Sequence, residues 1–121
     1  MSEADKAHKA AVRKIARVRK AGGTDLDLSG ATFAALEKIP DQITGLTGLG
    51  TLILSGTKIN DLAPLAALTA MKVLNLNETQ VADLAPLAAL TAMEVLNLSQ
   101  TQVTDLAPLA AMTAMEQLFL S

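Results

Sequence analysis

Asp25 and Asp27 are the two residues of this chain that come nearest to a catalytic pair. They alternate with Leu26 and Leu28, a pattern that predicts a short strand. Their side chains would then share one face of that strand, roughly 7 Å apart, which is compatible with acid–base chemistry. Two acids on one face of a strand are ordinary, however, and no pocket is implied. We therefore expect the protein not to be an enzyme.

The other residues that could take part in catalysis or metal binding support the same expectation. The single histidine, His8, has no fixed acid or nucleophile partner, and the chain has no cysteine. Asp61, Asp83 and Asp105 recur at equal intervals and could be read as a column of calcium ligands. Each also precedes Leu-Ala-Pro-Leu, where an aspartate can cap a helical turn by accepting a backbone N–H bond. We expect these caps, with no metal and no cofactor.

Charge is divided unevenly along the chain. Residues 1–21 carry seven Lys or Arg against two acids, a charge of +5, whereas residues 22–121 carry three against ten, a charge of −7. Five of the early cations form a stripe at helical spacing: Lys6, Lys9, Arg13, Arg17 and Lys20. The simpler interpretation is a solvated face. The alternative is an electrostatic binder of nucleic acid or acidic surfaces. No aromatic residue is interleaved to stack bases, so we do not expect nucleic acid as the partner.

The segment that carries these cations predicts an amphipathic helix over residues 2–21. Ser2 is a suitable N-cap, and Gly22 or Gly23 supplies the stop. An apolar stripe at spacings of 3, 4, 4 and 3 consists of Ala4, Ala7, Ala11, Ile15 and Val18. This stripe is mostly alanine, too weak for a membrane anchor. We predict that residues 1–23 are a capping helix for the rest of the chain.

The remainder of the chain is a repeat. Residues 68–89 return almost unchanged as residues 90–111, and residues 46–67 are a looser copy. A fixed period in this range, about 22 positions, predicts a solenoid. Alternating apolar residues predict one short strand per repeat, and stacking would place equivalent leucines in two buried columns. These columns are Leu52, Leu74, Leu96 and Leu118, then Leu54, Leu76, Leu98 and Leu120.

The first repeat is irregular. The interval from Leu26 to Leu52 exceeds the interval from Leu52 to Leu74 by four positions. We predict that the excess bulges between Ala31 and Leu36, where Phe33 tucks inward. We also expect Pro40 to begin a helical turn. The solenoid would then comprise an irregular repeat (24–45), three regular repeats (46–67, 68–89 and 90–111) and a partial repeat (112–121).

The pattern Met71-x-x-Leu74-x-Leu76-x-x-Thr79-x-Val81, followed by Asp-Leu-Ala-Pro-Leu, resembles a bacterial leucine-rich repeat of the short internalin class. The resemblance covers nearly the whole chain. It implies an α/β fold: a right-handed solenoid with a parallel concave sheet of about five short strands, 3₁₀ or short helical turns on the convex side, and a helical cap. One departure from the family is that threonine stands where the corner of each repeat usually has asparagine, at Thr57, Thr79 and Thr101.

Side chains that alternate with the buried leucines are predicted to project from the concave face. The surface is mixed: mainly uncharged and polar, with apolar positions. Solenoid faces of this kind typically bind proteins or peptides. The partner-binding residues that we predict are Asp27, Thr51, Ile53, Val73, Asn75, Asn77, Val95, Asn97, Gln117 and Phe119. Phe119 is the strongest single candidate, because aromatic residues are enriched at binding hot spots.

The last predicted strand has no further repeat to cover it. It would leave an open strand edge and an uncovered end of the leucine core near Met112, Met115, Leu118 and Leu120. Such an edge is a template for pairing. We predict self-association through Gln117, Leu118, Phe119 and Leu120, giving a symmetric antiparallel homodimer.

Taken together, the sequence predicts a protein–protein interaction scaffold whose partner is a protein or peptide. The absence of cysteine and of any long apolar run favours a cytoplasmic protein that does not enter a membrane. The near-identical repeats leave another alternative open: a consensus-like or engineered array with no natural ligand. Recent duplication of a natural repeat gives the same pattern.

Overall fold

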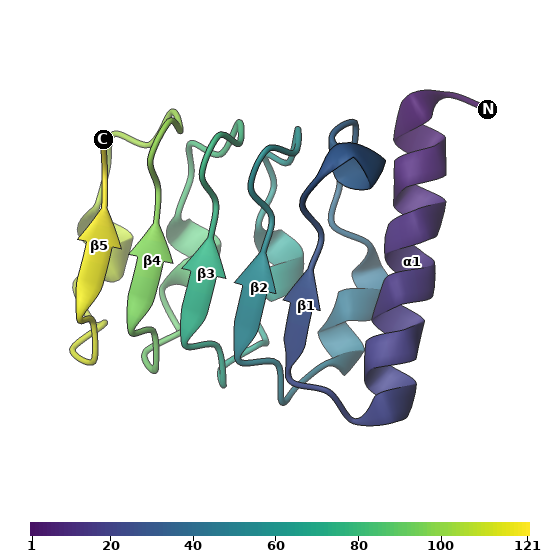
Figure 1. The fold of residues 1–121 in the computed structure, drawn as a ribbon. Coiled ribbons are helices and arrows are strands. Elements are labelled where there is room, and N and C mark those ends of the chain that lie inside the picture. Colours follow the sequence, from purple (N-terminus) through teal and green to yellow (C-terminus); the bar gives the residue numbers. More distant parts are fainter.

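The computed structural model describes the whole chain, residues 1–121, as one helix followed by five short strands that alternate with 3₁₀ turns. The helix α1 spans Glu3–Ala21. The strands form one parallel sheet in chain order: β1 (Asp25–Asp27), β2 (Thr51–Ile53), β3 (Val73–Asn75), β4 (Val95–Asn97) and β5 (Gln117–Phe119). Figure 1 shows α1 at one end of the row of strands, β5 at the other, and the turns behind the sheet. The predicted leucine-rich repeat solenoid is confirmed.

The register of the sheet follows the sequence period. Leu52 pairs with Leu74, Leu74 with Leu96, and Leu96 with Leu118. The irregular first repeat joins the same register, since Leu26 pairs with Leu52 despite the additional residues between them. Each strand is only three residues long, so the strands are stable as a stack and not singly.

The helix begins and ends at the residues that the sequence indicated. The Ser2 hydroxyl accepts the N–H of Asp5, and the Asp5 carboxylate accepts the N–H of Ser2, which makes a capping box. Gly22 ends the helix at a φ of 68°, a left-handed conformation that glycine adopts without steric cost. Ala7, Ala11 and Ile15 are buried against the first repeat. The small alanines therefore allow a close approach, whereas the five residues of the basic stripe stay exposed.

The excess residues of the first repeat form the predicted bulge. Ala31–Phe33 is a 3₁₀ turn, and Phe33 is buried with only 7% of its surface exposed. The expectation for Pro40 was wrong by one position. Pro40 has an extended ψ of 138° and precedes the turn Asp41–Gly45 instead of starting it.

In each regular repeat, side-chain hydrogen bonds stabilise two turns of the backbone, one on the convex side and one after the strand. At the convex turns, Asp61 accepts the N–H of Ala63 at 2.9 Å, and Asp83 and Asp105 do the same in their repeats. At the corner after the strand, the threonine hydroxyl donates to the carbonyl three positions earlier, as from Thr79 to Leu76 at 2.7 Å. Thr57 and Thr79 are thereby buried with their hydroxyls satisfied. The aspartate column therefore has a local structural role.

A left-handed backbone residue precedes each of these threonines. Gly56 has a φ of 72°, and the equivalent Glu78 and Gln100 have φ values of 57° and 58°. A residue with a side chain is strained in this region. Only Gly56 signals this corner in the sequence, so the feature was not predicted for the later repeats.

Burial falls at the last repeat. Leu74 and Leu96 are fully buried, whereas Leu118 in the same column is 38% exposed. The next column behaves alike, because Leu76 is fully buried and Leu120 is 51% exposed. The predicted uncovered end of the core is confirmed for these leucines. Met112, which was placed near this end, is instead buried within the core.

Candidate functional site

The ten predicted partner-binding residues lie on one face of the sheet. Asp27, Gln117 and Phe119 are exposed. The other seven are half-buried because neighbouring strands crowd them: Thr51, Ile53, Val73, Asn75, Asn77, Val95 and Asn97. The strand pairings align them in columns, such as Thr51, Val73, Val95 and Gln117. A repeat fold of this kind presents a continuous surface suited to protein interaction.

A second column of this face, made of Asp27, Ile53, Asn75, Asn97 and Phe119, contains residues that also stabilise the turns after the strands. The side-chain oxygen of Asn75 accepts the N–H of Asn77 at 2.9 Å, and that of Asn97 accepts the N–H of Ser99 at 2.9 Å. These are bonds of an asparagine side chain to the backbone two positions on, which favour a turn. These two bonds use the side-chain oxygen and leave the two N–H donors of each carboxamide out of the turn. The sequence did not indicate this second role.

Asp27 occupies the same position on β1 and holds the same kind of turn. Its carboxylate accepts the hydroxyl of Ser29 and, at 2.9 Å, the N–H of Ser29. The hydroxyl bond is the main cause that holds the pKa of Asp27 below its ordinary value of 3.8, with smaller contributions from the Ser29 N–H and the positive charge of Lys14. Partial desolvation acts in the opposite direction and is outweighed. Asp27 is therefore an anion at neutral pH.

Replacing Ser29 with alanine should raise the pKa of Asp27 toward its ordinary value. A depressed folded-state pKa contributes stability that is present above the unfolded-state pKa and is lost as the pH falls through the folded-state pKa. In Ser29→Ala, the free energy of unfolding should therefore fall less than in the unaltered protein as the pH is lowered through the pKa of Asp27. A carbon-13 NMR titration of the Asp27 carboxyl checks this. Ser55→Ala is the matched control, because the equivalent position before Ser55 on β2 is Ile53 and not an acid. If Asp27 titrates in Ser29→Ala as it does in the unaltered protein, the Ser29 hydroxyl is not the main cause of the lowered pKa.

The outer edge of β5 is unpaired. Within the sheet, Leu76 donates its N–H to the carbonyl of Asn97, and Leu98 donates to that of Phe119 at 2.7 Å. The equivalent N–H of Leu120 faces the side where this chain has no further strand. Phe119 is 46% exposed beside it. The four predicted edge residues, Gln117, Leu118, Phe119 and Leu120, are therefore all exposed.

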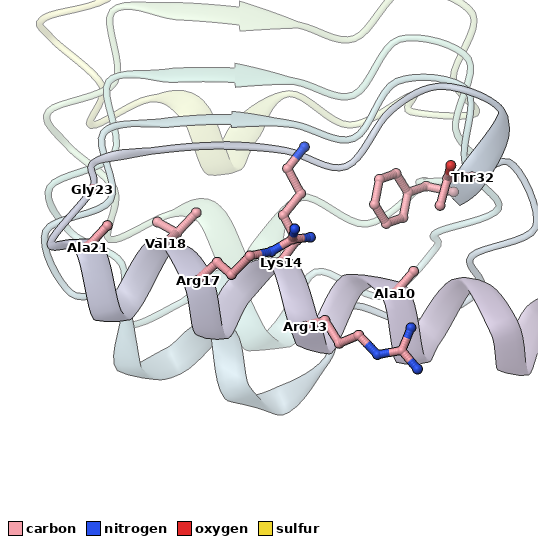
Figure 2. A pocket seen from close by; sticks show the side chains of 9 residues that line it. Ala10, Arg13, Lys14, Arg17, Val18, Ala21, Gly23 and Thr32 are labelled. Carbon is pink, nitrogen blue, oxygen red and sulfur yellow. The ribbon is translucent and has the colours of Figure 1, made fainter.

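A second concave feature lies at the other end of the molecule, between α1 and the bulge of the first repeat. It is a groove of about 620 Å³ that Arg13, Lys14 and Arg17 line from the helix. Figure 2 shows these three side chains along α1, with Thr32 across the groove. The sequence indicated the basic stripe and the inward Phe33 separately, but not that they meet. The additional residues of the first repeat, next to a basic helix, were the only signal of it.

Two absences in the structure are plain. No group of three or more histidine, cysteine or acidic side chains is arranged to hold a metal ion. No helix is both long enough and apolar enough to cross a membrane.

These features define the class of protein: a leucine-rich repeat solenoid with a helix at its N-terminal end. No protein-family model and no curated protein sequence matches the chain. Solved structures do match it. Internalin C2 of Listeria monocytogenes aligns with a TM-score of 0.67 and 26% identity, over 88% of this chain and 54% of its own.

Internalin InlF of the same organism aligns with a TM-score of 0.62 and 28% identity, over 93% of this chain and 43% of its own. A leucine-rich repeat protein of Leptospira interrogans aligns with a TM-score of 0.66 over 78% of this chain and 25% of its own, and its 22% identity supports the fold alone. The chain thus spans about half or less of the length of these proteins. The fold of the chain is therefore that of the bacterial internalin-like leucine-rich repeat proteins.

Proposed function

We propose that the chain is a non-catalytic scaffold that binds a protein or peptide partner on its concave face. The observation that carries this proposal is the alignment of ten accessible side chains in continuous columns over five parallel strands. Such a surface can contact an extended partner at several points at once. The fold of an interaction scaffold, shared with the internalins, supports it.

The composition of this face suggests how a partner is held. Val73 and Val95 are neighbours in one column and supply an apolar patch. Asn75 and Asn97 lie beside them and offer the N–H donors that their turns leave free. Phe119, the one exposed aromatic side chain, supplies an anchor at the C-terminal end. The face carries little charge, so binding there should depend weakly on salt.

The test compares two surfaces of the same repeats. Val73→Glu/Val95→Glu places charge on the concave face, and Ala66→Glu/Ala88→Glu places the same charge on the exposed convex turns. In quantitative affinity capture followed by binding measurements on the recovered partner, the concave variant should bind at least about tenfold more weakly. The convex variant should bind like the unaltered protein. The proposal would be overturned if the convex variant lost affinity, or if both variants bound like the unaltered protein.

A second candidate role is self-association through β5. The observation that favours it is the row of exposed edge residues Leu118, Phe119 and Leu120 beside unpaired backbone groups. An open strand edge pairs readily with another strand. A second copy of this chain offers an identical edge, and a twofold axis would pair the two β5 strands antiparallel.

A further inference from the structure

The groove between α1 and the bulge of the first repeat has the size and the walls of a binding site, and it is separate from the concave face. Its volume of about 620 Å³ falls within the range of roughly 300–1,000 Å³ that is usual for ligand sites. Its walls come from two different elements, the helix and the turn Ala31–Phe33. The additional residues of the first repeat form that second wall.

Arg13 and Arg17, two of the three cations of this groove, form no ion pair within the protein, whereas Lys14 lies near enough to Asp27 to lower the pKa of that carboxyl. The only ion pair in the protein joins Lys6 to Glu3, outside the groove. Arg13 and Arg17 are exposed and lie one helical turn apart, where like charges at i and i+4 destabilise a helix. A carboxylate placed between them relieves that repulsion and accepts N–H bonds from both guanidinium groups.

Lys14 adds a third cation in a fixed position. Its ammonium donates a hydrogen bond to the backbone carbonyl of Asp27 and lies 5.7 Å from the centroid of the Phe33 ring. Figure 2 shows that Lys14 projects from α1 on the side of the groove toward the strands. The middle of the groove therefore carries three cations.

Apolar side chains flank the cations of the groove. Ala10, Val18, Ala21 and Phe33 contribute this part of the lining. From Ala10 to Ala21 the helix rises about 16 Å, a length that an extended peptide of about five residues spans. A single small anion would contact only one part of such a groove. Phe33 is buried beneath Lys14 and offers no free face on which a nucleic acid base could stack.

We propose that this groove binds a short acidic peptide, an extended segment in which carboxylates alternate with aliphatic side chains. The carboxylates on one side of the extended backbone contact Arg13, Arg17 and Lys14, and the aliphatic side chains on its other side face the turn Ala31–Phe33, which forms the opposite wall. The site is separate from the concave face, so either one can fail without the other.

The experiment is a fluorescence anisotropy titration of the full chain with a fluorescein-labelled Glu-Leu-Glu-Leu-Glu peptide at low salt. Arg13→Gln/Arg17→Gln should weaken binding at least about tenfold, because it removes two charge-assisted contacts. Lys9→Gln/Lys20→Gln is the matched control: it removes the same charge from the same helix outside the groove, and should change affinity by less than about threefold. Circular dichroism verifies that both variants keep the helix.

Two further probes separate the alternatives. A Gln-Leu-Gln-Leu-Gln peptide should bind at least about tenfold more weakly than the acidic one. Equal losses in the two double variants would mean diffuse attraction and would overturn the site. No binding of the acidic peptide would overturn it as well. Tighter binding of a labelled oligothymidylate would replace the proposal with a nucleic acid surface.

Discussion

Leu74→Ala should lower the free energy of unfolding by about 3 kcal/mol, whereas Leu118→Ala should lower it by no more than about 1 kcal/mol. The two leucines occupy the same column of the same sheet, in matching register. Leu74 is fully buried between Leu52 and Leu96, whereas Leu118 is 38% exposed. The strands are held about 4.8 Å apart by backbone hydrogen bonds, so the wall around Leu74 cannot collapse into the space that alanine leaves.

Urea unfolding followed by far-ultraviolet circular dichroism gives both values. Protein concentration must be low, so that association does not cover Leu118. If the two variants lose equal stability, the end of the column is as well packed as its centre, and the difference in burial has no energetic consequence. A loss confined to Leu74 would show that the stability of this solenoid comes mainly from contacts between neighbouring repeats.

The repeat period was sufficient to predict the sheet register, because parallel stacking places equivalent residues of successive repeats side by side. The two leucine columns and the concave columns follow from the same alternation. The N-cap at Ser2 and the end of the helix at Gly22 could also be predicted from the sequence, since both depend on residues close together in the chain.

Other features depend on contacts that no local pattern encodes. Glu78 and Gln100 adopt the left-handed conformation at the position that Gly56 holds in an earlier repeat, although their own residue types do not favour it. The groove beside α1 arises only when the helix packs against the bulge at Phe33. Two of its cations, Arg13 and Arg17, belong to the stripe for which the sequence left two interpretations open, a solvated face or an electrostatic binding surface. Asn75 was predicted as a binding residue, but its bond to the backbone of Asn77 depends on a turn geometry that the alternation does not specify.

Purified protein should show a mass that rises with concentration from 12.6 kDa toward twice that value, if two β5 edges pair as proposed. Leu118→Lys/Leu120→Lys should abolish this rise. Charged side chains on an edge strand oppose pairing with another strand, and antiparallel pairing of two such edges would bring the introduced positive charges of the two copies close together. Both positions are exposed, so the variant should remain folded.

Sedimentation velocity over a concentration series is the measurement, carried to the highest soluble concentration because a short edge buries less area than a stable dimer usually needs. Thr69→Lys/Ala70→Lys is the matched control, since it adds the same charge at exposed positions of a middle repeat. A constant mass of 12.6 kDa at every concentration would mean that the edge tolerates water and is available to another partner. Association that persists in Leu118→Lys/Leu120→Lys would place the contact elsewhere on the molecule. If only the edge variant stays monomeric, the dimer contact includes the β5 edge beside Phe119, and a ligand of the proposed concave-face site that contacts Phe119 should then compete with dimerisation.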